Sequence, residues 1–144
     1  MEVRTTAAGV TVINDAYNAN TESMIAALKT LKTMSRGGRG WAVLGPMAEL
    51  GDTAVQEHAR VGQMVVRLGI EKLLTVGTGA KVIHDTFLIE GSLPEDAQHV
   101  ETVEDAVGFL TAALRAGDVV LVKASRSAGL ERVALALAPD GGTS

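Results

Sequence analysis

Short runs of apolar residues alternate along the chain with longer stretches in which apolar residues recur at the spacing of a helix. The short runs, which are expected to form strands, cover residues 10–13, 41–44, 72–76 and 119–122. The stretches with helical spacing include residues 24–31, 52–66, 82–83, 103–114 and 130–137. In the second of these helices, the stripe expected to be buried consists of Val55, Ala59, Gly62 and Val66. Such alternation is typical of right-handed βαβ units.

The order of these elements predicts an α/β domain with a doubly wound, mostly parallel sheet of the Rossmann-like class. Residues 119–122 show no polar alternation, as expected of a strand that is buried on both faces of a parallel sheet. Near the start of the chain, residues 2–4 and 10–13 flank the turn Ala7-Ala8-Gly9 and predict a hairpin at one edge of the sheet. We expect one domain over residues 1–138 and a polar tail at 139–144.

The composition narrows the class of protein. The 144 residues are 47% hydrophobic, which is enough for one buried core and argues against intrinsic disorder. A formal net charge of −4 and an aromatic content of 3% do not provide the basic, base-stacking surface of a nucleic-acid binder. The sequence has no cysteine, and no apolar stretch approaches the ~20 residues of a membrane span. We therefore expect a cytoplasmic protein without membrane insertion.

Polar and glycine-rich segments follow the expected strands, and ligands of a doubly wound sheet bind at these carboxyl ends. The first segment runs from Asn14 to Asn20. One interpretation is a turn in which Asn20 or Thr21 caps the next helix. The other adds a ligand, because the Asp15 carboxylate could accept two ribose hydroxyls while Tyr17 and the asparagine amides bond or stack against a base. The two interpretations are compatible, since a helix N-terminus favours an anion.

The second segment, Gly45-Pro46-Met47-Ala48-Glu49-Leu50-Gly51, follows residues 41–44. Two glycines bracket a proline and a glutamate, so the backbone is expected to turn sharply and to stay accessible. A structural turn with an exposed Glu49 is the plainer interpretation. His58 lies in the following helix without a further ligand at metal spacing, and we expect a solvated or core-edge histidine there.

The third segment, Lys123-Ala124-Ser125-Arg126-Ser127, follows the last expected strand. Its two cations and two hydroxyls could hold a carboxylate or a phosphate. The alternative is a serine that caps the next helix beside solvated charges. A further segment, Gly77-Thr78-Gly79, resembles the start of a dinucleotide-binding fingerprint, but Val82 stands in place of the third glycine and the signal is discounted.

The sequence contains no complete catalytic set. It has no G-x-x-x-x-G-K-[ST] phosphate loop, no carboxylate cluster suited to Mg²⁺ and no G-x-S-x-G elbow. The residues by themselves indicate a ligand-binding α/β domain that should not cleave ATP alone.

Taken together, the three segments resemble the Mur ligase family. Residues 15–20 resemble the D-x-Y-N-A-N-P motif of the members that add D-alanyl-D-alanine, residues 45–51 resemble their L-G-D-M-x-E-L-G loop, and residues 123–126 resemble their K-G-S-R. Order and spacing agree from Arg4 to Leu137. The chain thus resembles the C-terminal domain of such a ligase, with the N-terminal and central domains expected outside these residues.

The resemblance implies an ATP-dependent amide ligase of peptidoglycan precursor synthesis. In this family ATP phosphorylates the terminal carboxyl of UDP-N-acetylmuramoyl-tripeptide, and the amine of D-alanyl-D-alanine attacks the acyl phosphate. The N-terminal domain holds the UDP group, while the central domain brings the phosphate loop and the Mg²⁺ ligands. This chain alone is therefore expected to be inactive, and to have its own upstream domains, ATP and the two peptide substrates as partners.

Position by position, the resemblance also implies residue roles. The expected nucleotide site consists of Asp15, Tyr17, Asn18 and Asn20. The expected acceptor or intermediate site consists of Met47, Glu49, Lys123, Ser125 and Arg126. Asp15 would hold the ATP ribose and Asn20 would shape the turn, whereas Glu49 and the backbone around Met47 would line the acceptor side. No residue is expected to bind a metal.

Two positions depart from the family pattern. Thr21 stands where proline is usual, which loosens the helix start but keeps a capping hydroxyl. Pro46 stands where aspartate is usual, which removes an acid from the acceptor loop. Two other functions stay open: a stand-alone α/β module that binds a nucleotide or small anion, and the C-terminal domain of a related amide ligase of the folylpolyglutamate synthetase type.

Overall fold

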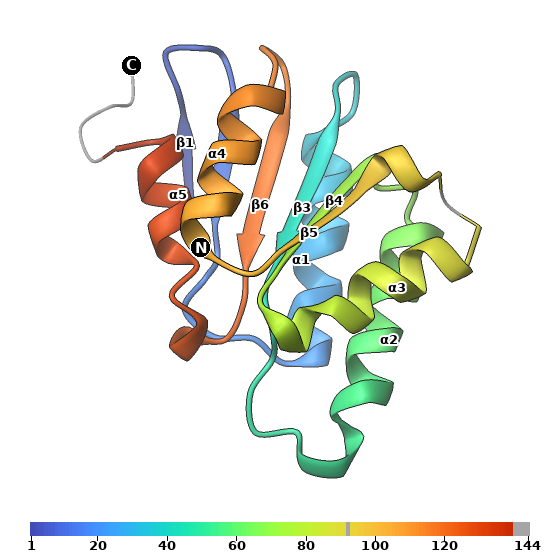
Figure 1. Cartoon of the computed structure of the whole chain (residues 1–144). Helices are drawn as coiled ribbons and strands as arrows, with labels where there is room; N and C mark the ends of the chain where they lie inside the picture. Colours follow the sequence, from blue (N-terminus) through green and yellow to red (C-terminus); the bar gives the residue numbers. More distant parts are fainter. Residues whose placement is uncertain (92, 140–144) are drawn as a thin grey trace.

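The computed structural model describes residues 1–91 and 93–139 and consists of one sheet with helices on both faces (Figure 1). Within these residues the strands are β1 (Glu2–Thr5), β2 (Thr11–Asn14), β3 (Gly40–Leu44), β4 (Lys72–Val76), β5 (Ala97–Val100) and β6 (Val119–Lys123). The α-helices are α1 (Thr21–Met34), α2 (Ala54–Arg67), α3 (Lys81–Ile89), α4 (Val103–Ala113) and α5 (Glu131–Leu137). Of the expected tail at 139–144, residues 140–144 lie outside the described residues.

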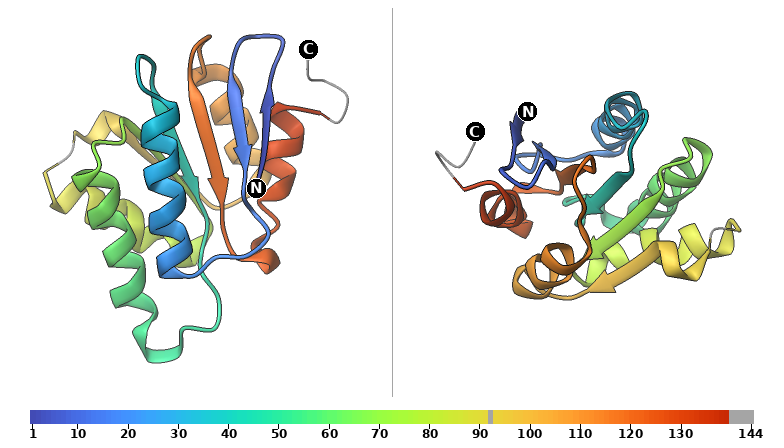
Figure 2. Two further views of the ribbon diagram at one scale, coloured as in Figure 1. Left: turned by 180° about the vertical axis from the view of Figure 1, so that it is seen from behind. Right: turned by 90° about the horizontal axis from the view of Figure 1, so that it is seen from above.

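The sheet has the order β1-β2-β6-β3-β4-β5, and each neighbouring pair is parallel except β1 and β2. The prediction of a mostly parallel, doubly wound sheet with an edge hairpin is confirmed. Helices α1, α2 and α3 cover one face, and α4 and α5 cover the other (Figure 2). The chain therefore passes from β2 and from β3 to helices on the first face. From β6, the strand that lies between β2 and β3 in the sheet, it passes to a helix on the second face. A doubly wound sheet opens a crevice at such a point.

The edge hairpin turns the start of the chain toward this crevice. β1 runs antiparallel to β2, with Glu2 opposite Asn14 and Thr5 opposite Thr11. Gly9 closes the turn at a φ of 85°, a backbone conformation that glycine adopts without steric cost. Residue Met1 consequently lies at the carboxyl end of β2.

Two sequence-based expectations about the elements are wrong. The strand β5 was not predicted, because its sequence Ala-Gln-His-Val has no apolar run and it pairs with β4 alone, at the edge of the sheet. In α2 the buried residues are His58, Val61, Gly62 and Val65, and Val55 is exposed. The prediction is right for Gly62, but the buried stripe also contains His58, which hydrophobic periodicity does not mark as apolar.

Gly62 allows α2 and α3 to approach each other closely. A Cβ atom at Gly62 would lie 2.8 Å from the carbonyl oxygen of Ile83 and 2.9 Å from Cβ of Thr86. Alanine normally favours a helix over glycine by about 0.8–1.0 kcal/mol, but here it would force the helices apart.

We expect Gly62→Ala to lower the free energy of unfolding by about 1–2 kcal/mol, because overpacking outweighs the gain in helix propensity. Gly108 in α4 is the matched control, since nothing lies within 4 Å of a Cβ atom built there. Gly108→Ala should raise the free energy of unfolding by about 0.5–1 kcal/mol. Urea unfolding of both variants checks this pair, and two changes of the same sign would contradict it.

A buried carboxylate closes the opposite, amino-terminal end of the sheet. Asp118 precedes β6 and accepts hydrogen bonds from Nε and Nη2 of Arg39 at 2.9 and 2.7 Å, from Nε1 of Trp41 at 3.0 Å and from the Arg115 amide at 2.9 Å. Burial raises the pKa of this carboxyl, but the hydrogen bonds from Arg39, Arg115 and Trp41 outweigh burial, and the pKa lies below its usual value. Asp118 thus ties β3 and the α4–β6 connection to one point.

No helix among residues 1–91 and 93–139 is both long enough and apolar enough to cross a membrane.

Candidate functional site

The loops after β2, β3 and β6 meet at the carboxyl end of the sheet, the lower end in Figure 1. Between them lies a hollow of about 630 Å³. Its lining residues come from all three loops and are Asn18, Ala48, Glu49, Ser125, Arg126 and Ser127. Four of the residues singled out by sequence, Asn18, Glu49, Ser125 and Arg126, therefore share one cavity.

Lys123 holds the loop that follows β2. Its side chain is only 3% exposed, and its ammonium donates to Oδ2 of Asp15 at 2.9 Å and to the carbonyl oxygen of Asn18 at 2.9 Å. A longer contact of 3.4 Å reaches the carbonyl oxygen of Asp15. The Asp15 side chain is 25% exposed, so part of its carboxylate faces solvent while Lys123 fixes the rest. The structure places Lys123 beneath the first loop rather than on the surface of the hollow.

Asn20 caps α1, as predicted by the interpretation of residues 14–20 as a turn that caps the next helix. Its side chain accepts from the Ser23 amide at 2.8 Å, and the Ser23 hydroxyl accepts from the Asn20 amide at 3.0 Å, so the two residues form a capping box. Thr21 does not supply the cap, contrary to the expectation that it keeps a capping hydroxyl. The Thr21 hydroxyl donates instead to Oε1 of Glu57 in α2, at 2.5 Å. The residue in the usual place of proline thereby links the starts of α1 and α2.

The Tyr17 ring and the Arg126 guanidinium, two planar groups, lie against each other on the surface beside Asp15. The Arg126 guanidinium lies 5.0 Å from the centroid of the Tyr17 ring, and its Nη1 donates to the Tyr17 hydroxyl at 3.4 Å. Tyr17 is 70% exposed, which is unusual for so large a ring in a chain with few aromatic residues. A second hollow of about 320 Å³ lies against this pair. It is lined by Met1, Asn14, Asp15, Ala16, Tyr17, Arg126 and Glu131.

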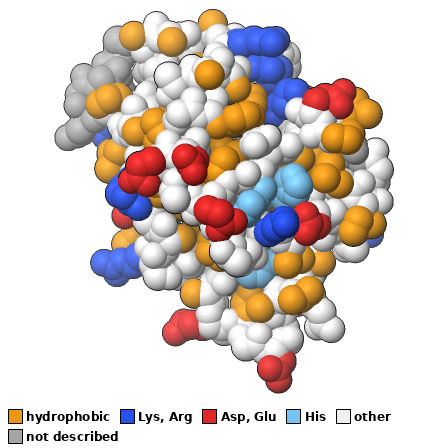
Figure 3. Space-filling model, viewed as in Figure 1, with side chains coloured by type: hydrophobic (Ala, Val, Ile, Leu, Met, Phe, Trp, Pro, Cys, Tyr) orange, Lys and Arg blue, Asp and Glu red, His pale blue; other side chains and the backbone are white. Residues whose placement is uncertain are grey.

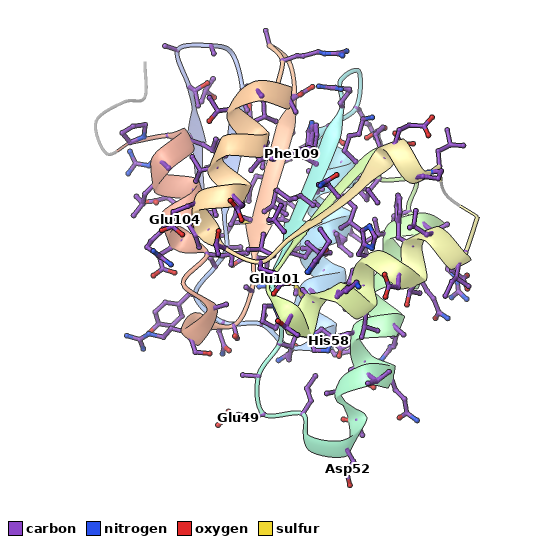
Figure 4. The ribbon with its side chains drawn as sticks, in the orientation of Figure 1. Glu49, Asp52, His58, Glu101, Glu104 and Phe109 are labelled. Atoms are coloured by element: carbon purple, nitrogen blue, oxygen red, sulfur yellow. The ribbon has the colours of Figure 1, made fainter. Side chains whose placement is uncertain are left out.

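The loop after β3 is fixed at its start and projects at its tip. The carbonyl oxygen of Pro46 accepts from the Ser125 amide at 2.9 Å, and the Met47 amide donates to Nε2 of His58 at 2.9 Å. The Met47 side chain is buried, and Met47 does not line the hollow, contrary to the expectation for the acceptor side. Glu49 has a φ of 61°, which is unusual for a residue other than glycine and marks local strain. Figure 4 shows Glu49 and Asp52 on the part that projects beyond the sheet, with His58 nearer the sheet.

His58 is an anchor of this loop that sequence reasoning did not identify. It is buried, which excludes the solvated alternative of the two expected, and its Nδ1 lies 2.7 Å from the carbonyl oxygen of Ala54. A carbonyl only accepts, so Nδ1 carries the proton and Nε2 is free to accept from Met47. The signal in the sequence was the position of a histidine on the buried stripe of α2, which the wrong assignment of that stripe concealed.

The Gly77-Thr78-Gly79 turn supports Pro46. A Cβ atom at Gly79 would lie 3.1 Å from Cβ of Pro46, and one at Gly77 would lie 3.6 Å from its Cδ. The glycines therefore leave room for the proline, which gives this turn a packing role.

A hydrogen-bonded chain of side chains lies next to the turn. Oγ1 of Thr78 donates to Glu101 at 2.7 Å, Glu101 contacts Nε2 of His99 at 2.5 Å, and Nδ1 of His99 contacts Thr75 at 2.7 Å. The hydrogen bond from Thr78, followed by that from His99, lowers the pKa of Glu101. Histidine, basic and acidic side chains gather over this part of the surface (Figure 3). Thr75, at one end of this hydrogen-bonded chain, is fully buried, whereas Thr78 at the other end is exposed.

The described residues hold no group of three His, Cys, Asp or Glu side chains that could bind a metal ion.

Known ligases are similar in sequence to nearly the whole chain. A UDP-N-acetylmuramoyl-tripeptide–D-alanyl-D-alanine ligase of Mycobacterium tuberculosis is 45% identical over 157 aligned positions that include 97% of this chain. The enzyme of the same name from Bacillus subtilis is 33% identical over 92% of this chain. The chain covers 31% and 29% of the lengths of these two proteins.

Solved structures agree with the sequence comparisons. The MurF ligase of Thermotoga maritima, whose crystal structure contains ADP, superimposes with a TM-score of 0.76 at 27% identity, over 92% of this chain and 28% of that one. MurF of Acinetobacter baumannii gives the same TM-score at 28% identity, also over 92% of this chain and 28% of that one. The family model described as Mur ligase, glutamate ligase domain, matches residues 1–126. The chain therefore belongs to the family of Mur ligase, glutamate ligase domains.

Proposed function

We propose that this chain is the C-terminal domain of an ATP-dependent ligase that joins D-alanyl-D-alanine to UDP-N-acetylmuramoyl-tripeptide through an acyl phosphate. The observation that carries the proposal is the place of Arg126, which lines both hollows. A guanidinium shared by the two hollows places a nucleotide site and an acceptor site side by side, as a ligase that consumes ATP requires. The relatives named above are ligases of this reaction, and the chain spans about 30% of their length.

The smaller hollow suits the nucleoside part of ATP. Asp15 presents a carboxylate whose solvent-facing side can accept hydrogen bonds from ribose hydroxyls, and the Tyr17 ring offers a face on which a base can stack. Lys123 orients that carboxylate from below through its contacts with Asp15 and Asn18. We assign Lys123 a positioning role here, which differs from the acceptor-side role that the resemblance implies.

The larger hollow suits the incoming dipeptide, which carries an amine at one end and a carboxylate at the other. Glu49 can hold an ammonium group, and Arg126 with the hydroxyls of Ser125 and Ser127 can hold a carboxylate. Because the two groups come from separate loops, both ends of the dipeptide can be held at once and its amine is oriented for attack.

The remaining parts of the reaction belong to the proposed upstream domains. They would hold the UDP group and the transferred phosphate and supply the Mg²⁺ ligands, so that this domain alone has no ligase activity. The closing of this domain over them would exclude the water that hydrolyses an acyl phosphate. We place the whole enzyme in the cytoplasm.

Asp15→Asn in the full-length protein tests the nucleotide assignment. We expect the KM for ATP to rise about tenfold, because a hydrogen bond to a charged group contributes about 1.5–3 kcal/mol. The KM for D-alanyl-D-alanine should stay within about twofold, since the dipeptide binds in the other hollow. Steady-state kinetics with each substrate varied in turn measures both values.

Asp85→Asn is the matched control, because that carboxylate is 53% exposed on α3 and contacts only its neighbour His84 among the described residues. Unchanged ATP kinetics in Asp15→Asn would refute the nucleotide assignment. If the full-length protein bound ATP but consumed none in the presence of tripeptide and dipeptide, a binding module would replace the ligase. Turnover with folate and glutamate would indicate the folylpolyglutamate synthetase type.

A further inference from the structure

We infer that His58 is a positioning residue that sets where Glu49 meets the incoming dipeptide. This inference rests on the proposed function of the acceptor loop. The family resemblance implies no role for His58. The His58 side chain is buried and does not line the hollow. Its effect on a substrate therefore has to pass through the loop.

The loop has few other attachments near its tip. Two backbone hydrogen bonds attach the start of the loop to β6 and the segment after it. The Gly45 amide donates to the carbonyl oxygen of Lys123 at 3.0 Å, and the Ser125 amide donates to the carbonyl oxygen of Pro46 at 2.9 Å. Beyond Pro46, the Met47 amide is bonded to His58. Ala48 and Glu49, which follow, are exposed. The Met47 sulfur also accepts from the Thr21 hydroxyl at 3.8 Å. The bond to His58 is the last side-chain hydrogen bond to the loop backbone before the residue that faces the dipeptide.

The geometry at His58 requires one form of the imidazole ring. Nδ1 donates to the Ala54 carbonyl one turn earlier in α2, and this leaves Nε2 as the acceptor for the Met47 amide. Since Ala54 is the first residue of α2, the ring couples the start of the helix to the loop backbone. Rigid support of this kind holds a contacting group within a fraction of an ångström of its working position.

The test uses two substitutions of His58 and one control in the same helix. His58→Leu removes the acceptor, whereas His58→Gln places an oxygen at the same bond distance from Cα as Nε2. Val65→Ala, at a fully buried site of α2, destabilises the helix packing without touching the loop.

In the full-length protein, His58→Leu should raise the KM for D-alanyl-D-alanine about tenfold while the KM for ATP stays within about twofold. His58→Gln should recover most of the loss, and Val65→Ala should change neither KM. An unchanged dipeptide KM in His58→Leu, or an equal rise in Val65→Ala, would overturn the inference.

Amide hydrogen exchange separates this inference from the proposed function, because it needs no turnover. The Met47 amide should exchange slowly in the wild-type protein and in His58→Gln, and at least about tenfold faster in His58→Leu. If the wild-type enzyme did not use the dipeptide but Met47 behaved in this way, the proposed function would fail while the anchoring of the loop by His58 stood. Equal exchange of Met47 in all variants would refute the anchor itself.

Discussion

Replacing Asp118 by alanine is expected to lower the free energy of unfolding by about 3–5 kcal/mol, a large part of the stability of a domain of this size. The change leaves the Arg39 guanidinium, the Trp41 indole N–H and the Arg115 amide without the carboxylate that accepts from all three. Trp41 is buried, so its donor cannot turn to water instead. Urea unfolding of the wild-type and variant proteins measures the difference.

Asp96→Ala provides the comparison for a more exposed ion pair. Asp96 accepts a hydrogen bond from Lys72 at 2.7 Å, but about a quarter of the surface of each side chain is exposed to solvent. Its loss should cost no more than about 1 kcal/mol. Equal losses in the two variants would contradict the importance given to the buried network around Asp118.

The contribution of Asp118 should also depend on pH. Because its pKa in the folded protein is lowered, the group stabilises the fold above its unfolded-state pKa of about 3.9 and loses this contribution as the pH falls through the folded value. The stability difference between wild type and Asp118→Ala should be constant from about pH 5 to 7 and shrink below about pH 4. A difference that stays constant below pH 4 would contradict the lowered pKa.

Replacing Lys123 by methionine should reduce kcat/KM for ATP about 100-fold in the full-length enzyme. Methionine keeps the length of the side chain but offers no donor, so the carbonyl of Asn18 and the carboxylate of Asp15 lose their shared partner. We also expect a loss of about 2–3 kcal/mol in the free energy of unfolding, because a buried charge pair is broken. Kinetics at saturating dipeptide and thermal unfolding measure the two effects.

A double-mutant cycle shows whether Lys123 acts through Asp15. If it does, Lys123→Met combined with Asp15→Asn should be hardly slower than Lys123→Met alone, because both changes remove the same oriented carboxylate. If the two losses in kcat/KM multiplied, Lys123 would contact a substrate directly. The acceptor-side role implied by the family resemblance requires this second result.

The sequence predicted the strands β2, β3, β4 and β6 well, because each is an apolar run bounded by polar or glycine-rich segments. It did not predict β5, whose Gln98 and His99 are accommodated at a sheet edge where one side of the strand has no neighbour. In α2, the packing of Gly62 on Ile83 and Thr86 decides which face is buried. Gly62 was predicted in the buried stripe and is buried, but Val55, Ala59 and Val66 were assigned to the stripe in place of His58, Val61 and Val65, because periodicity does not count a histidine as apolar.

The segments that form the candidate site were predicted from the sequence, but the hydrogen bonds between them were not. The segments that contain Asp15, Glu49 and Arg126 could be selected because polar residues at strand ends are recognisable in a sequence. The bond from Lys123 to Asp15 spans 108 positions of the chain, and that from Thr21 to Glu57 spans 36. Which donor meets which acceptor over such separations depends on strand order and crossover, which a pattern of residues does not specify.

The antiparallel direction of β1 has a mechanical consequence for the full-length ligase that we propose. A segment that precedes Met1 would enter beside Asp15 and Tyr17, since Met1 lines the same hollow. When a body rotates about its attachment, points near the pivot move little and distant points sweep the widest arc. A domain joined there would keep its nucleoside hollow close to the pivot as it turns, while the loop that carries Glu49, which projects beyond the sheet (Figure 4), would move further. The dipeptide could then enter and leave through a wide opening without the nucleotide being released.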